Sequence, residues 1–150
     1  MTEEEGYFTL KGYRLRQGRG ITDAMEDYVE MLFREGGSGQ VRTGRLARLL
    51  HVGPSSVSKM AAVLRKEGLA EYQPYGAIAL TPRGRELGAY LLRRHQVLRR
   101  FFRFLNGPES SLREVEQLEH FIRPRTLENL ERLLDRLEGA SPPLLPPPPP

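Results

Sequence analysis

Apolar residues recur at helical spacing in the first third of the chain. Over residues 22–34 they fall at i, i+3, i+4 and i+7, and either Thr22 or Asp23 can cap the N-terminus of the helix that this spacing predicts. Its apolar face comprises Met25, Tyr28, Val29 and Leu32. After a break at GGSGQ, residues 36–40, Thr43 can cap a short helix that carries further apolar residues. The pattern predicts two helices separated by a loop.

A third helix opens in the segment HVGPSSVSKMAAVLRKEG. Pro54 suits its first turn, where a missing N–H costs nothing, and Gly68 is placed to end it. Its buried stripe comprises Val57, Met60, Ala61 and Leu64. The following LAEYQPYGAIAL predicts two short strands around a turn at residues 74–76. Helix, short helix, turn, helix and hairpin in this order are typical of a winged helix-turn-helix.

The remainder of the chain predicts helices and then a tail. A long helix runs from Thr81 and Pro82 to about residue 106, and Ser111 with Glu114 forms an S-x-x-E capping box for the next helix. A final helix spans about residues 126–137. Residues 140–150, rich in proline, predict an extended tail. We therefore expect a basic arm at residues 1–20, a winged helix-turn-helix at 21–81, a helical domain at 82–139 and the tail, in a mainly α fold with a small β-wing.

Composition narrows the class of protein. The chain has 150 residues, of which 39% are hydrophobic, which suits one compact domain or two small ones with a buried core. It has no cysteine, so disulfides, zinc–thiolate sites and cysteine nucleophiles are excluded. The acidic N-terminus MTEEEGYF lacks an apolar run, and no segment approaches the roughly 20 apolar residues that a membrane span needs. We expect a cytoplasmic protein with no membrane partner.

Charge is segregated along the chain, although the net charge is only +4. Residues 6–22 carry four basic residues and no acid, and residues 34–66 carry seven basic residues against one acid. In residues 107–139 the balance reverses, with eight acids and five arginines. This pattern indicates that one end meets a polyanion; the alternative is clustering on solvated faces.

The helix-turn-helix suggests double-stranded DNA as the polyanion. Its second helix enters the major groove with its N-terminal residues at the base edges. Here that end carries Pro54, Ser55, Ser56, Ser58 and Lys59. Arg42 and Arg45, with Arg48, suit the flanking backbone, and their number argues against the alternative, a helical hairpin used only for protein contacts. The arm, with Arg14, Arg16 and Arg19, either follows the duplex or packs on the protein itself.

A second chemistry is suggested by SSLREVEQLEHFI. Glu116, Glu119 and His120 stand at i, i+3 and i+4, and are therefore neighbours on a helix surface. Asp27 and Glu30 form another i, i+3 pair, which in isolation predicts an exposed acidic face, and His95 in isolation predicts a surface or core histidine. Glu119 borders an apolar stripe and should be half-buried, so it needs a positive partner, either a metal ion or an arginine. These residues alone leave both readings open.

Five segments together resemble the manganese-responsive members of the diphtheria-toxin-repressor family of metal-dependent transcription regulators. They are EDYVEML, PSSVSKM, LTPRG, RRHQVLRRF and VEQLEHF, in order over residues 22–137. The resemblance implies a homodimer of winged helix-turn-helix domains, each followed by a helical dimerisation domain, that binds an operator and represses metal-uptake genes. It also implies a site for two Mn²⁺ ions per protomer, with Asp27, Glu30, His95, Glu116, Glu119 and His120 as ligands.

The chemistry of this ligand set agrees with Mn²⁺. Four carboxylates and two imidazoles are hard or borderline donors, although heavier divalent ions bind such sites more tightly and Fe²⁺ remains a candidate. Iron-responsive relatives resemble this pattern but place methionine and cysteine at the positions of Asp27 and Glu116. Two alternatives stay open: a winged-helix repressor that no metal gates, and a di-metal hydrolase. The second lacks an evident phosphate-binding loop, and we expect no enzyme.

Overall fold

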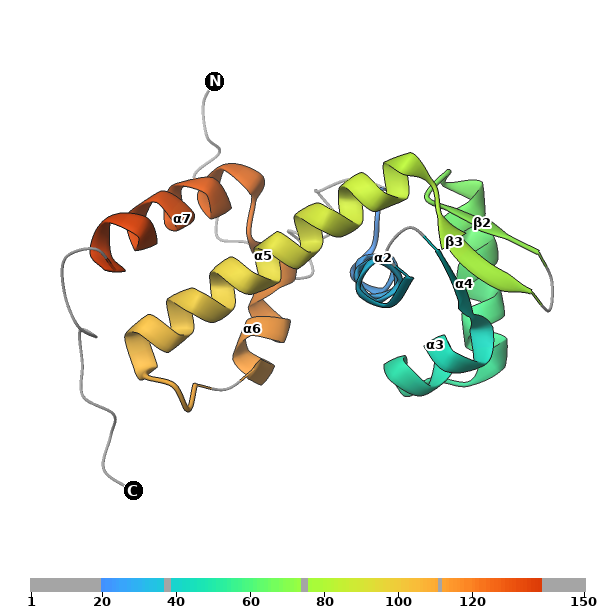
Figure 1. Ribbon diagram of the computed structural model, residues 1–150, viewed down its shortest axis with the longest axis horizontal. Coiled ribbons are helices and arrows are strands. Elements are labelled where there is room, and N and C mark those ends of the chain that lie inside the picture. The colour runs from blue at the N-terminus through green and yellow to red at the C-terminus, as the bar shows by residue number, and fades with distance from the viewer. Residues whose placement is uncertain (1–19, 37–38, 74–75, 111, 139–150) are drawn as a thin grey trace, which may run out of the picture.

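The computed structural model describes residues 20–36, 39–73, 76–110 and 112–138 (Figure 1). Its helices are α2 (Asp23–Gly36), α3 (Thr43–Leu50), α4 (Pro54–Lys66), α5 (Pro82–Asn106), α6 (Leu112–Leu118), the 3-10 helix η1 (Glu119–Phe121) and α7 (Pro124–Glu138). Its strands are β1 (Gln40–Arg42), β2 (Ala70–Tyr72) and β3 (Ala77–Leu80). The predicted fold class, mainly helical with a small β-wing, is confirmed.

The helix-turn-helix consists of α3 and α4. The turn after α3 is closed by His51, which adopts the left-handed conformation with φ 54°. The N–H groups of His51 and Val52 donate to the carbonyls of Arg48 at 3.3 Å and Ala47 at 3.0 Å, which satisfies two carbonyls at the end of the helix. A glycine is the usual residue for this conformation, so a histidine here carries backbone strain.

The sheet is antiparallel, with strand order β1-β3-β2. β2 and β3 form the predicted hairpin, with Ala70 opposite Leu80, and Ile78 is fully buried. β1 lies on the other edge of β3, with Val41 opposite Ile78. The sequence analysis missed this strand, because three residues after a glycine-rich break are too few to show alternation.

Where the structure describes a helix end, the predicted caps agree with it in all but one case. The Thr22 hydroxyl accepts from the N–H of Met25 at 3.2 Å, Pro54 opens α4, and Gly68, with φ 73°, follows its end. The prediction for Thr43 is wrong: Arg42 occupies the N-cap of α3 without a side-chain hydrogen bond. Four predictions fall wholly or partly outside the described residues: the basic arm, the turn at residues 74–76, the capping box of Ser111 and the polyproline tail.

The long helix α5 connects two hydrophobic cores (Figure 1). At its N-terminal end it lies so close to its neighbours that only glycine fits: a Cβ on Gly84 would lie 1.9 Å from the Leu69 carbonyl oxygen, and one on Gly88 would lie 2.6 Å from Phe33 Cβ. The first core joins α2, α3, α4 and the sheet, and the second joins α5, α6 and α7. Tyr90 packs against both.

The chain changes conformation after α6. The sequence predicted one helix through the LEHFI segment, but α6 ends at Leu118 and η1 follows. Pro124 provides a physical reason, because the residue before a proline is disfavoured in the helical region and the next helix begins at Pro124 itself. Within the described residues, the helices are too short or too polar to cross a membrane.

Candidate metal centre

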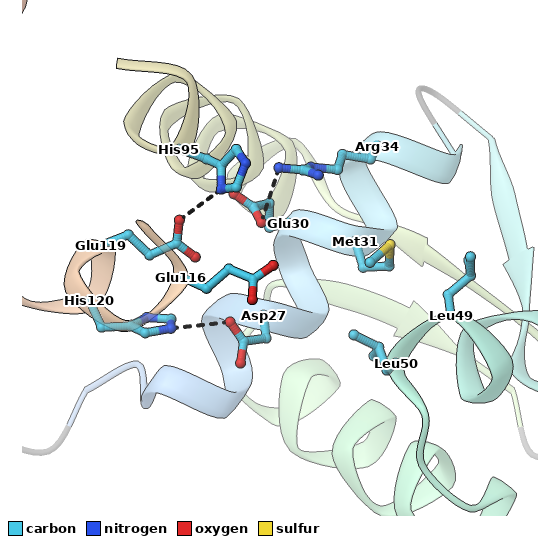
Figure 2. A pocket seen from close by; sticks show the side chains of 10 residues that line it. All are labelled: Asp27, Glu30, Met31, Arg34, Leu49, Leu50, His95, Glu116, Glu119 and His120. Atoms are coloured by element: carbon cyan, nitrogen blue, oxygen red, sulfur yellow. Dashed lines mark hydrogen bonds and ion pairs between the residues drawn. The ribbon is translucent and has the colours of Figure 1, made fainter. Parts of the chain in front are cut away.

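All six predicted ligands line one pocket of about 330 Å³ (Figure 2). Asp27 and Glu30 project from α2, His95 from α5, Glu116 from α6, and Glu119 and His120 from η1. Residues far apart in the sequence therefore meet where the helix that precedes the helix-turn-helix faces the C-terminal helices. The rest of the lining consists of Met31, Arg34, Leu49 and Leu50.

The apolar packing of α2 decides which of its residues reach the pocket. Val29 and Leu32 are at most 2% exposed in the first core, so Asp27 and Glu30 lie on other sides of the helix. The prediction of an exposed acidic face is right for Asp27, whose side chain is 51% exposed, and wrong for Glu30, whose side chain is 15% exposed. The opposing elements α5 and η1 cover Glu30, and a single helix plotted by itself cannot show them.

Glu119 and His95 are the two most buried members of the set, at 4% and 8% exposure. His95 Nδ1 lies 3.0 Å from Glu119 Oε2. The prediction that Glu119 is half-buried is therefore wrong, because the residue is almost fully buried. The partner of Glu119 in the structure is the imidazole of His95, whereas the sequence predicted either a metal ion or an arginine. A buried carboxylate retains its charge only with such a partner.

His120 stands between two carboxylates of α2. Its Nε2 lies 3.2 Å from Asp27 Oδ1, and its Nδ1 lies 3.1 Å from Glu26 Oε1. Because Asp27 and then Glu26 accept hydrogen bonds from the ring, the pKa of His120 is raised to about 10 despite partial burial. The ring is therefore protonated at neutral pH and acts as a cation between two acids.

The two carboxylate oxygens of Glu30 differ in their partners: one lies in an ion pair, and the other has no hydrogen-bond partner. Arg34 Nη2 lies 3.5 Å from Oε2, whereas Oε1 is buried without a hydrogen-bond partner. Burial raises the pKa of Glu30, and the nearby Glu119 carboxylate raises it further. A buried acceptor without a donor is costly, so this oxygen is suited to a cation.

The donor atoms fall into groups that fit divalent cations. Glu30, His95 and Glu119 offer ligand atoms within 4.8 Å of one another, and so do Asp27, Glu119 and His120. Glu119 belongs to both groups. Glu116 belongs to neither, but its carboxylate points into the space between them (Figure 2). Oxygen-rich donors with two imidazoles suit hard or borderline ions.

A third group, Asp23, Glu26 and His120, is equally close but less suited to a cation. Arg94 Nη1 donates to Glu26 Oε2 at 3.1 Å, so a positive charge already stands beside this carboxylate. The sequence analysis missed both Glu26 and Arg94. A signal existed for each: Glu26 precedes Glu30 by four residues, and Arg94 falls in register with Tyr90, Val97 and Phe101 on one face of α5.

The predicted DNA-binding residues belong to β1, α3 and α4, and the helices α3 and α4 lie on the other side of α2 from α6 and α7 (Figure 1). At the N-terminal end of α4, Pro54, Ser55, Ser56 and Lys59 are exposed, and Ser58 is half-buried. Arg42 and Arg45 are exposed, and with Arg48 they line a groove that Gly76 and Ala77, at the turn end of the wing, also border. Arg45 is not unpaired, because its Nε donates to Glu35 Oε2 at 2.8 Å.

Comparison with protein families finds two matches, one after the other along the chain. Residues 20–78 match the family described as "Iron dependent repressor, N-terminal DNA binding domain". Residues 81–141 match "Iron dependent repressor, metal binding and dimerisation domain". The boundary between the two matches falls near the start of α5.

Comparison with individual proteins points in the same direction. The chain is 34% identical over 119 residues to the "HTH-type transcriptional regulator MntR" of Lysinibacillus sphaericus (strain C3-41), covering 78% of this chain and 86% of that protein. It is 38% identical over 105 residues to the protein of the same name from Geobacillus kaustophilus (strain HTA426), covering 67% and 73%.

Solved structures with this fold include one described as "Manganese-dependent transcriptional repressor complex with manganese". It matches with a TM-score of 0.64 and 28% identity, over 74% of this chain and 52% of that chain. The "Crystal Structure of ScaR with bound Cd2+" matches with a TM-score of 0.63 and 30% identity, over 75% and 54%. The present chain spans about half the length of these solved structures.

Proposed function

Because this chain belongs to the iron-dependent repressor family of metal-dependent transcription regulators, we propose that it is a Mn²⁺-responsive repressor whose pocket holds two ions per protomer. One observation carries the proposal: six side chains of the right chemistry, drawn from four separate elements, converge on a single pocket. The assignment of these six as ligands, the number of ions and the choice of Mn²⁺ are the parts that need testing.

The two groups of donor atoms suggest how the ligands divide. Glu30 and His95 hold one ion and Asp27 and His120 the other, with Glu119 shared between them and Glu116 completing the set. A bound divalent cation supplies the positive charge that neutralises these converging carboxylates. The donors are hard enough for Mn²⁺, and Fe²⁺ is the competitor to test against it.

The ligands connect the DNA-binding elements to the C-terminal helices. Asp27 and Glu30 belong to α2, which packs in the first core beside α3 and α4, and Leu49 and Leu50 at the end of α3 line the same pocket. His120 and Glu119 belong to η1 on the other side. Once all of them hold the same pair of ions, α2 has one fixed position relative to η1.

Fixing α2 has a consequence for DNA only if the protein is dimeric, and the matched C-terminal family is a dimerisation domain. Two α4 helices then stand at one separation, and a dimer binds two half-sites a helical turn of DNA apart or a multiple of it. Metal raises DNA affinity by removing the free energy cost of selecting that arrangement. We propose metal-uptake genes as the targets.

The test is DNA binding measured with and without metal. Fluorescence anisotropy with DNA from upstream of the protein's own and neighbouring genes, titrated in Mn²⁺ and in chelator, should show binding that depends on Mn²⁺. Equal binding in chelator would favour the alternative of a winged-helix repressor that no metal gates. The hydrolase alternative has no support from the matched families, which are transcription regulators.

The number of ions needs a separate measurement. Anaerobic calorimetry with Mn²⁺ should report two sites per protomer, because two donor groups share Glu119. A single site would mean that some of the six side chains are not ligands.

A further inference from the structure

Arg94 is the one arginine below 9% exposure in the described part of the chain, and it is not a predicted ligand. It lies on α5, and its guanidinium reaches α2 and η1. Its Nη1 donates to Glu26 Oε2 at 3.1 Å, and its Nη2 lies 3.5 Å from His120 Nδ1. Its Nε is buried without a hydrogen-bond partner. A buried, permanently charged group needs a reason to be there.

The contacts of Glu26 provide that reason. One oxygen of its carboxylate accepts from Arg94, and the other lies 3.1 Å from His120 Nδ1. An ionised carboxylate only accepts hydrogen bonds, and so His120 must carry a proton on Nδ1. The protonated ring also donates from Nε2, which faces Asp27 Oδ1 at 3.2 Å, so a cation that replaces this second proton finds the lone pair of Nε2 beside a predicted ligand, whereas the carboxylate at Nδ1 is already paired with Arg94.

We propose that Glu26 and Arg94 are positioning residues that fix the tautomer and the orientation of His120, so that Nε2 faces the ion shared with Asp27. The inference rests on the proposed metal site and deepens it. Histidine ligands commonly donate their other N–H to a carboxylate, which sets the tautomer and makes the ligating nitrogen a better donor. Arg94 holds the carboxylate in place, because its own helix is packed on both cores.

His95 provides an internal contrast. Its Nδ1, not its Nε2, lies 3.0 Å from Glu119 Oε2 and therefore faces the donor groups. The two histidines should then use opposite ring nitrogens: His95 binds through Nδ1 and carries its proton on Nε2, and His120 does the reverse. A simple ion pair between Glu26 and Arg94, with no effect on the ligand, would not predict this assignment for His120.

The first test reads the spectrum of the unaltered protein, and variants serve only to assign its signals. The chain has three histidines, so ¹⁵N-histidine spectra of the protein loaded with Cd²⁺, a diamagnetic probe, can be assigned with His51→Gln and His95→Gln variants. We expect His120 to bind Cd²⁺ through Nε2 and to retain a proton on Nδ1. Coordination through Nδ1, or a proton on Nε2, would overturn the proposal.

The second test measures Mn²⁺ affinity by calorimetry in a Glu26→Gln variant. The amide replaces one of the two acceptor oxygens by an NH₂ group, so Arg94 and His120 can no longer each be served by a separate oxygen. We expect the site that includes Asp27 and His120 to weaken by about 10- to 100-fold, as for other groups that orient a metal ligand, while the site that includes Glu30 and His95 is unchanged.

The matched control is Arg93→Gln, on the neighbouring residue. Arg93 pairs with Glu131 on an exposed face of α5, so its loss should change neither site. Less than a threefold change in Glu26→Gln, or equal weakening of both sites, would refute a positioning role. If the unaltered protein binds no Mn²⁺ at all, the proposed metal site fails instead, so the two failures are distinguishable.

Discussion

Different forces stabilise the DNA-binding side of the pocket and the contact between its two sides. On the DNA-binding side, α2, α3, α4 and the sheet share a core in which Val29, Leu64 and Ile78 are fully buried. Between η1 and α2, by contrast, His120 forms ion pairs with Asp27 and Glu26. Apolar burial does not depend on a ligand, whereas like-charged carboxylates meet only when cations are among them. The difference leads us to predict that metal acts on the junction and not on the fold of either half.

The largest expected effect comes from breaking the apolar side. Leu64→Ala removes a fully buried side chain from α4 and should lower the free energy of unfolding by about 2–5 kcal/mol. Because the loss lies in the core, it should be the same in Mn²⁺ and in chelator. Denaturant titrations in both conditions measure it. The adjacent Val63→Ala, at a position 42% exposed, is the control and should change stability little.

The junction between α2 and η1, unlike the core, should depend on metal for its stability. Mn²⁺ at 100 times its dissociation constant stabilises a folded protein by about 2.7 kcal/mol for one site. Glu119→Gln removes the carboxylate common to both donor groups, so most of this metal-induced gain should disappear. Melting curves with and without Mn²⁺ measure the gain. Glu131→Gln, in the exposed pair with Arg93, should retain it; an undiminished gain in Glu119→Gln would remove Glu119 from the ligand set.

Backbone strain offers a smaller effect, confined to the DNA-binding half. His51 has φ 54°, so His51→Gly should raise the free energy of unfolding by about 1 kcal/mol. Gly68 has φ 73°, and a Cβ there would make only an ordinary contact, 3.8 Å from Arg83 Nη1, so Gly68→Ala should lower it by about 1 kcal/mol through strain alone. Mn²⁺ should leave both changes as they are. In chemical unfolding, the free energy of unfolding should change in opposite directions in the two variants. Changes in the same direction would exclude strain as the cause.

The smallest expected change concerns one phosphate contact. Lys59 is exposed near the start of α4, and Lys59→Ala should reduce the slope of log affinity for DNA against log salt by roughly one unit. Its Mn²⁺ affinity should not change, because the residue lies outside the pocket. Anisotropy titrations at several salt concentrations measure the slope. An unaltered slope would remove Lys59 from the proposed phosphate contacts.

Much of the fold could be predicted because local signals and packing agree. The face of Met25, Tyr28, Val29 and Leu32 is buried as its spacing indicates, and Pro54 opens α4. β1 could not be predicted, because its three residues become a strand only by pairing with β3. The predicted domain boundaries stay predictions, since α5 contributes residues to both cores.

The ligand set of the pocket could be predicted, but the residues around these ligands could not. The resemblance supplied the six predicted ligands among the residues that line it, whereas spacing alone left Glu30 exposed and His95 without a role. Glu26 and Arg94 were missed because their local signals, the four-residue spacing to Glu30 and the register with Tyr90 on α5, do not indicate which residue they contact. Only the meeting of α2, α5 and η1 shows that these two residues contact His120.

The central claim is that ions in the pocket act by joining α2 to η1, and a covalent link can replace them. The chain has no cysteine, so Asp27→Cys with His120→Cys introduces the only two thiols, which a short bifunctional reagent can bridge. The bridged protein should bind operator DNA in chelator with an affinity near that of the unaltered protein in Mn²⁺, and the unbridged variant should not. If the bridged protein remains inactive in chelator while the unaltered protein responds to Mn²⁺, joining the two elements is not how metal controls DNA binding.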